Sequence, residues 1–304
     1  MKRSRKILAG ISLLAASALA LTGCASGAEL SGKSGEKLDN GDEKQITIAV
    51  FNGWDEGVAA SELWKAVLEE QGYDVTLEPA DVAPVYSGLS TGDYDLVLDG
   101  WLPITHKSYV EQYGDKIVDL GAWNDEAKLT FAVNEDAPIT SIDELAANAD
   151  KFDNTIIGIE PGAGLTEVTQ NDVIPGYGLD QMTYTTSSTA AMLTELKSKT
   201  DAKENIVVTL WRPHWAYDAF PIRDLEDPKG LLGDAESIHS FSSKEFETTH
   251  PKVSSWVKNF KMDSEKLYSL ENAMFGGEKT DDYGPIVEQW ISENQAYVDS
   301  LTAQ

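Results

Sequence analysis

The sequence predicts an α/β protein of two lobes. Two stretches of similar size each alternate short β-branched runs with amphipathic helical segments, a pattern typical of sheets with parallel strands. We expect the chain to cross between the lobes near residues 134–137 and again near 239–244. In folds of this kind a ligand binds in the cleft between the lobes, outside the carboxyl ends of the strands.

The first stretch reads strand, helix, strand, helix, strand. ITIAVF at 46–51 is a buried strand by its β-branched and aromatic content, and residues 56–70 place their large apolar side chains on one helical face. Val75 and Leu77 indicate a second strand. A short helix over 82–89 and the strand DLVLDG at 95–100 complete the unit.

The second stretch repeats the alternation. Ser141 and Glu144 have the spacing of a helix capping box. TIIGIE at 155–160 predicts a strand that leads into a glycine-rich turn. The segments 183–185 and 205–210 predict two further strands, with a helix between them.

The chain is helical by periodicity after about residue 242. Trp256 and Trp290 fall on apolar helix faces, so we expect both to be core residues. The predicted first lobe comprises residues 46–135 and 242–304, and the second lobe comprises residues 136–241.

The amino terminus has the pattern of a bacterial lipoprotein signal peptide over residues 1–23. Four basic residues precede an apolar run that is shorter than a membrane span, and LTGC follows it. Cys24 is the only cysteine of the chain, and we predict that its thiol is lipidated rather than buried. Residues 24–45 are polar and glycine- and serine-rich, as in a flexible tether.

Composition excludes several classes of protein. The chain carries 51 acidic against 24 basic residues, a net charge of −27, which disfavours nucleic acid and anionic lipid as partners. A single cysteine permits no intrachain disulfide. Because neither a G-x-S-x-G elbow nor an H-E-x-x-H motif is present, we predict that the chain is no enzyme and holds no metal or cofactor. An exported hydrolase and a purely structural surface lipoprotein are the alternatives from other classes.

Three predicted strands each deliver a tryptophan at the carboxyl end. Trp54 follows the first strand, Trp101 follows DLVLDG, and Trp211 follows the strand at 205–210. One such tryptophan is usually a packing residue, but three converging indole faces form a cage for a cation that has no N–H to donate. A quaternary ammonium group is such a cation.

A carboxylate could bind beside this cage. His106 lies five residues after Trp101, and the turn that ends in Gly164 and Leu165 opens a helix whose free N–H groups suit an anion. The predicted ligand is thus a small zwitterion. We interpret Asp55 and Glu56 as helix-start residues, although they could also help to hold the cation.

Several motifs give the chain a resemblance to a known family. They are GWDE at 53–56, GWLPITH at 100–106, EPGAGL at 160–165, SSTAAML at 187–193, WRPHW at 211–215 and EDPKGLLGDAESIH at 226–239. With these motifs the chain resembles the glycine betaine/proline betaine substrate-binding proteins of ABC importers. The resemblance implies a two-lobed periplasmic-binding-protein-like fold of type II. Among members with the two halves in either order, this chain carries the WLPxTH half first.

The resemblance also assigns roles. It implies an aromatic box of Trp54, Trp101 and Trp211 around the trimethylammonium group. It implies that His106 and the backbone of Gly164 and Leu165 bind the carboxylate. Two positions depart from the family pattern, since Leu210 stands where glycine is frequent and Arg212 where a small polar residue is common. We expect the Arg212 guanidinium to point away from the box.

These expectations describe a monomeric receptor. It is anchored through Cys24 to the outer face of the cytoplasmic membrane, captures glycine betaine, and delivers it to a permease driven by an ATPase. A receptor for choline or carnitine is the alternative within this class.

Overall fold

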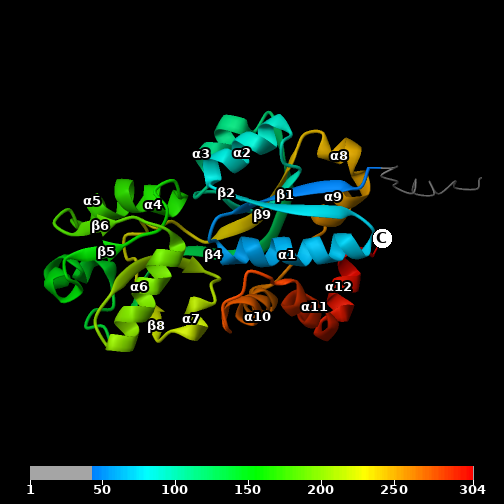
Figure 1. Cartoon of the computed structure of the whole chain (residues 1–304). Helices are drawn as coiled ribbons and strands as arrows, with labels where there is room; N and C mark the ends of the chain where they lie inside the picture. Colours follow the sequence, from blue (N-terminus) through cyan, green and yellow to red (C-terminus); the bar gives the residue numbers. More distant parts are fainter. Residues whose placement is uncertain (1–42, 304) are drawn as a thin grey trace, which may run out of the picture. The chain divides into compact units, whose positions relative to one another are not determined.

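A mixed β-sheet of nine strands runs through residues 43–303, the part of the chain that the computed structural model describes (Figure 1). These residues belong to one compact unit. The strand order is β2-β1-β3-β9-β4-β7-β5-β6, and β8 also pairs with β4. The strands are β1 (Gln45–Phe51), β2 (Asp74–Ala80), β3 (Leu96–Leu102), β4 (Ile117–Asn134), β5 (Thr155–Ile157), β6 (Thr183–Thr185), β7 (Val207–Arg212), β8 (Ile222–Asp224) and β9 (Glu236–Ser243). The predicted signal peptide, Cys24 and the tether up to residue 42 lie outside the described residues.

The first half of the sheet contains β1, β2, β3, β9 and the start of β4. The first three strands are parallel, as predicted. β1 pairs with both β2 and β3, and the connecting helices are α1 (Asp55–Glu70) and α2 (Val82–Thr91). Because β1 lies between β2 and β3, the two connections run in opposite directions across the sheet. Right-handed crossovers therefore place α1 and α2 on opposite faces, as Figure 1 shows.

Five helices follow β9 along the chain, and the last three lie on the side of the sheet that α1 occupies (Figure 1). They are α8 (Phe246–Thr249), α9 (Pro251–Lys258), α10 (Ser264–Phe275), α11 (Gly284–Glu293) and α12 (Gln295–Leu301). Helix α1 packs against α10 and α11. Trp256 and Trp290 are 2% and 3% exposed, so the prediction that both are core residues is confirmed. Trp64 of α1 meets the ring of Phe260 edge-on at 5.5 Å between centroids.

The second half of the sheet contains β5 to β8 and the end of β4. Strand β5 is parallel to both β6 and β7, but it ends at Ile157, earlier than the predicted strand. The helices of this half are α4 (Gly164–Val168), α5 (Ile174–Tyr177), α6 (Thr189–Ala202) and α7 (Ala216–Ala219), with a π-helical turn at Thr169–Val173. In the first half, the short helix α3 (Lys107–Tyr113) follows β3.

The predicted capping box at Ser141 is wrong. A 3₁₀-helix, Ile142–Glu144, follows Ser141, and the serine hydroxyl donates to the carbonyl of Glu226 at 3.2 Å instead of capping. The Glu144 carboxylate accepts from the N–H and the hydroxyl of Thr140. The box pattern fails because both side chains find other local partners, and a second 3₁₀-helix, Ala146–Phe152, continues the segment.

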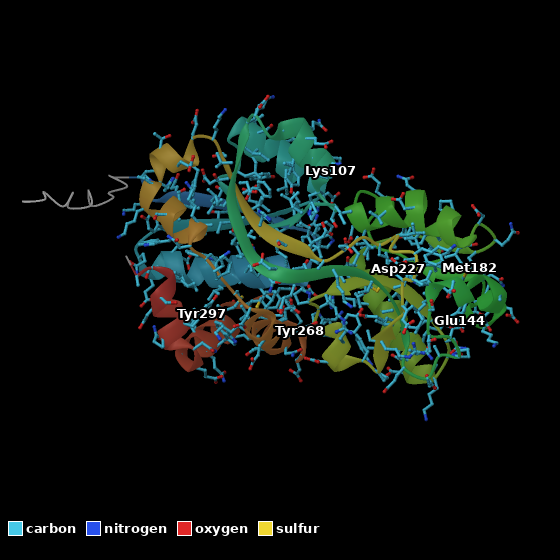
Figure 2. The ribbon with its side chains drawn as sticks, turned by 180° about the vertical axis from the view of Figure 1, so that it is seen from behind. Lys107, Glu144, Met182, Asp227, Tyr268 and Tyr297 are labelled. Atoms are coloured by element: carbon cyan, nitrogen blue, oxygen red, sulfur yellow. The ribbon has the colours of Figure 1, made fainter. Side chains whose placement is uncertain are left out.

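One long strand belongs to both halves of the sheet. β4 pairs with β9 from Ile117 to Ala127, and with β7 from Lys128 to Val133. The pairing thus changes earlier in the chain than the crossing expected at 134–137, and β9 rejoins the first half at Glu236, before the range 239–244. Residues 128–133 were expected in the first lobe, but they form a strand that pairs with β7 of the second half. Figure 2 shows β4 from behind, with Tyr268 of α10 and Asp227 of the returning segment labelled.

Within residues 43–303, no helix is long and apolar enough to cross a membrane.

Gly100 of β3 provides a test of packing between the strands. A Cβ atom at this position would lie 2.3 Å from the buried ring of Phe241 on β9. We expect Gly100→Ala to lower the free energy of unfolding by about 1–3 kcal/mol through overpacking, measured by urea denaturation. Gly277→Ala is the control because nothing lies within 4 Å of its added Cβ. Equal stability of the two variants would contradict the packing.

Candidate functional site

A small cavity lies where the two halves of the sheet meet. It encloses at most about 260 Å³ of free space, a volume that includes solvent at its mouth. A cavity of this size suits a solute of few atoms. Its walls come from both halves: Trp54, Glu56, Trp101, Thr105, Leu129, Ile159, Leu165 and Trp211.

The structure brings together the three tryptophans singled out from the sequence. Trp54 precedes the first turn of α1, Trp101 lies near the end of β3, and Trp211 lies near the end of β7. Their side chains are 6%, 3% and 3% exposed. The rings of Trp54 and Trp211 approach to 6.4 Å between centroids at an interplanar angle of 60°, so the indoles of different strands form adjoining walls.

Each of these indole N–H groups donates to a carboxylate. Trp101 donates to Asp99 at 2.8 Å, and Trp211 donates to Glu56 at 2.9 Å. Trp54 donates to Glu160 at 3.4 Å. With these donors occupied, the indoles offer the cavity their aromatic surfaces rather than free N–H groups.

Two of these hydrogen bonds join the two halves. Trp54 belongs to the first half and its acceptor Glu160 to the second, whereas Trp211 belongs to the second half and Glu56 to the first. A third such contact runs from the Trp215 indole to Asp55. Glu160 is itself fixed by the N–H and the hydroxyl of Thr189, at 2.7 and 2.9 Å.

Sequence reasoning underestimated the acidic residues of the site. Asp55 and Glu56 do lie in the first turn of α1, as expected. Their carboxyl groups, however, also accept indole N–H groups from the second half. Asp99, which precedes Gly100 and Trp101, is 1% exposed. The signal that could have identified these acids is their place beside the tryptophans in GWDE and DGW.

Burial raises the pKa of these carboxyl groups. For Glu56 desolvation raises the pKa to about 8, and the nearby Asp55 charge adds to the effect. Desolvation and then the Glu56 charge raise the pKa of Asp99 well above its usual range. Glu271 of α10 is also fully buried, with its pKa raised by desolvation and by Glu56. The buried carboxyl groups beside the cavity therefore hold their protons more tightly than ordinary carboxyl groups do.

His106 is completely buried behind Trp54 rather than at the cavity wall. Its ring stacks on that of Trp54 at 5.5 Å and 10°, and its Nδ1 accepts the backbone N–H of Trp101 at 2.9 Å. Burial lowers the pKa of His106 to about 3, so the ring is neutral at pH 7 and its proton lies on Nε2. The Nε2 atom has no hydrogen-bond partner. His106 therefore keeps one buried donor that no protein group occupies.

A buried glutamate holds the loop between Trp101 and His106. Oε2 of Glu236 accepts the N–H groups of Ile104 and Thr105 at 2.8 and 2.9 Å, and Oε1 accepts the Thr105 hydroxyl. Glu236 lies at the start of β9 and is 2% exposed. The strand that closes the first half therefore also fixes the position of Thr105 in the cavity wall.

The glycine turn of the second half meets this loop. Helix α4 begins at Gly164, and a Cβ at Gly164 would lie 2.1 Å from the carbonyl oxygen of Thr105, so only glycine fits there. Leu165 lines the cavity. The first N–H groups of α4 have no acceptor within the helix.

The neighbours of Trp211 point outward or pack in the core. Arg212 pairs with Asp224 at 3.0 Å and lies over the ring of Tyr217, so its guanidinium points away from the indoles as expected. Leu210 is fully buried in β7. His214 is fully buried, its Nδ1 accepts the N–H of Ala216 at 3.1 Å, and desolvation lowers its pKa to about 3.

In residues 43–303 no group of three or more His, Cys, Asp or Glu side chains has the geometry to hold a metal ion.

Two α/β halves around a ligand-sized cavity define a two-lobed binding protein of type II. A family model described as the substrate-binding domain of ABC-type glycine betaine transport systems matches residues 44–293, so the chain belongs to this family. Its members are substrate-binding proteins of transporters and not enzymes.

Solved and characterised relatives agree with this placement. The closed structure of lactococcal OpuAC with glycine betaine has a TM-score of 0.79 at 27% identity, over 86% of this chain and 100% of that one. The glycine betaine/L-proline-binding protein ProX of Borrelia burgdorferi has a TM-score of 0.80 at 29% identity, over 86% and 97%. The glycine betaine/carnitine transport binding protein GbuC of Listeria monocytogenes is 34% identical over 147 residues, which is 48% of either chain. The chain thus matches about half the length of that relative.

Glu236 provides a test of how the site is held. We expect Glu236→Leu to lower the free energy of unfolding by about 1–3 kcal/mol for each backbone N–H left without an acceptor. Hydrogen–deuterium exchange at Ile104 and Thr105 should accelerate as well. Glu236→Gln is the matched control, since its amide oxygen can still accept both N–H groups. Unchanged exchange in Glu236→Leu would show that other contacts hold the loop.

Proposed function

We propose that the protein is an extracytoplasmic solute-binding lipoprotein that captures glycine betaine, or a related trimethylammonium zwitterion, for an ABC importer. One observation carries the proposal: three indoles from separate strands, with their N–H groups occupied, line one small cavity together with a carboxyl group. Such a cavity attracts a cation and has little to offer a group that must donate hydrogen bonds.

The chemistry of the walls favours a methylated ammonium group. Each indole face contributes about 0.5–2 kcal/mol of cation–π attraction, with the larger values in desolvated sites. A quaternary ammonium has no N–H that would remain unsatisfied among apolar rings. Replacing methyl groups by hydrogen adds such donors, and burying each one without an acceptor is unfavourable. The cavity therefore selects by the number of methyl groups.

Two sets of donors are candidates for binding the carboxylate tail. The unpartnered Nε2–H of His106 and the first N–H groups of α4, at Gly164 and Leu165, come from opposite halves of the sheet. Binding the tail between them requires both halves to be present at the ligand. The relation to OpuAC, which was solved closed and complexed with glycine betaine, supports this arrangement.

The remaining proposals concern the context of the protein. The LTGC sequence that ends at Cys24 supports an anchor on the outer face of the cytoplasmic membrane, and the family supports a permease and its ATPase as partners. We propose a monomer whose first lobe comprises residues 46–135 and 242–304. The second lobe comprises residues 136–241. The strand pairing places the two boundaries somewhat earlier in the chain, near Ala127 and near Glu236. A carnitine or choline receptor is the alternative, and the name of GbuC includes carnitine.

The aromatic walls are tested by removing one ring at a time. We expect Trp54→Leu, Trp101→Leu and Trp211→Leu each to raise the Kd for glycine betaine by about 2- to 30-fold, the equivalent of one cation–π contact. Isothermal titration calorimetry measures the Kd. Trp290→Leu removes a core tryptophan far from the cavity and should lower stability without changing the Kd. Folded wall variants with an unaltered Kd would disprove the cage.

The carboxylate assignment is tested by comparing ligands. Asn at position 106 can still accept the Trp101 N–H as Nδ1 does, but it lacks the distant donor Nε2. We expect His106→Asn to weaken glycine betaine binding by about tenfold, as for the loss of one hydrogen bond to a charged group, and to leave choline binding nearly unchanged. An equal loss for both ligands would refute the role of His106 and favour the choline alternative.

A further inference from the structure

Glu56 is the one ionisable residue among the eight that line the cavity. It is 1% exposed, and it reaches the cavity from the first turn of α1. A carboxyl group in this place can exist in two states. It can hold a proton, or it can stay ionised beside a cation in the cavity.

The groups packed around Glu56 are all neutral or acidic. From its own helix comes Asp55, from β3 comes Asp99, and from α10 comes Glu271. The Asp55 charge raises the pKa of Glu56, and the Glu56 charge raises the pKa of both Asp99 and Glu271. Asp218 of α7 acts on Glu271 in the same sense. Two indole N–H groups donate to this set: that of Trp211 donates to Glu56, and that of Trp101 donates to Asp99.

No basic side chain balances this set. Across residues 43–303, the one ion-pair contact of these four carboxyl groups joins Asp55 to Nε2 of His214 at 3.8 Å. The pKa of His214 is lowered to about 3 by burial, so this imidazole is neutral at pH 7. Nothing in the surroundings thus supplies a positive charge in place of a proton or a ligand.

Unpartnered oxygen atoms provide a second, independent observation. Oδ2 of Asp99 and both carboxyl oxygens of Glu271 are buried with no hydrogen-bond partner. Oδ2 of Asp99 faces Gly57, where a Cβ would lie only 2.5 Å away. Asp99 is therefore pressed against the first turn of α1, next to Glu56. Buried and unpaired, an ionised Asp99 would be costly, and a proton removes that cost.

We propose that Glu56, supported by Asp99, is a proton-binding site in the ligand-free protein, and that the quaternary ammonium of the ligand displaces this proton. The inference rests on the proposed function. The exchange balances: neutral Glu56 and the zwitterion give the carboxylate beside the ammonium group, and one proton passes to solvent. The Trp211 N–H then donates to a charged acceptor, which strengthens that hydrogen bond between the halves.

The direction of the pH dependence follows from linkage. The pKa of Glu56 is raised to about 8 in the empty site, and a cation within about 4–6 Å lowers it by favouring the carboxylate. Between the lowered pKa and about 8, the free protein holds more protons than the complex. The Kd therefore falls as pH rises, by at most tenfold per pH unit, and becomes constant above about pH 8.

Calorimetry measures this exchange directly. Glycine betaine is titrated into the mature protein at about pH 7 in two buffers of different ionisation enthalpy, and the difference in heat gives the number of protons released. We expect about one proton released per ligand, together with a Kd that falls by about 10- to 20-fold between about pH 6.5 and about pH 8.

Variants identify the group. Glu56→Gln keeps an acceptor for the Trp211 N–H but cannot ionise, so proton release and the fall in Kd should both disappear. Asp99→Asn keeps an acceptor for the Trp101 N–H, and because Asp99 is already neutral in the ligand-free protein, proton release at about pH 7 should persist; its loss would assign the proton to Asp99 instead of Glu56. Glu160→Gln is the matched control, because Glu160 also accepts a wall indole but does not line the cavity. Whatever its effect on affinity, proton release should persist.

The outcomes separate the two proposals. Binding whose heat does not depend on the buffer would overturn the proton site and leave the betaine receptor intact, as would full proton release in Glu56→Gln. Absence of binding for betaine, carnitine and choline alike would overturn both. A circular dichroism melt of each variant confirms that it is folded before titration.

Discussion

The site depends on hydrogen bonds between indole N–H groups and carboxyl groups. A tryptophan in an aqueous cleft has one polar atom, and leaving that atom unsatisfied in a dry cavity is unfavourable. Asp99 accepts from Trp101 within one strand, whereas Glu56 and Glu160 accept from indoles of the opposite half. The bonds that turn the rings toward the cavity therefore also hold the two halves together, and the pocket exists only where both halves meet.

The sheet topology makes this convergence possible. β1 and β3 are parallel neighbours, so their carboxyl ends lie at the same edge and deliver Trp54 and Trp101 to one place. β7 reaches that place from the other half because it pairs with β4 directly after β4 leaves β9. Glu236 then ties the loop after β3 to the start of β9. The three tryptophans of the cavity thus lie in a strand or shortly after one, which fixes their positions.

The sequence was sufficient for the succession of strands and helices in the first unit and for selecting the three tryptophans that line the cavity. Strand ends are legible because a β-branched run stops at a glycine or a polar residue, and Trp54, Trp101 and Trp211 each lie at such a stop. The roles of Glu56 and Asp99 were not legible, since acids at helix starts and strand ends are common and their partners are distant in the chain. Ser141 misled for a similar reason: its hydroxyl bonds to Glu226, a residue that local spacing cannot identify.

The shared strand β4 has a mechanical consequence. One continuous backbone carries hydrogen-bond ladders to β9 on one stretch and to β7 on the next. Sliding of one half past the other would break these ladders, but a change of torsion spread over a few peptide units would not. The crossing in β4 therefore resists sliding of the two halves past each other, but it permits one half to rotate relative to the other about the strand.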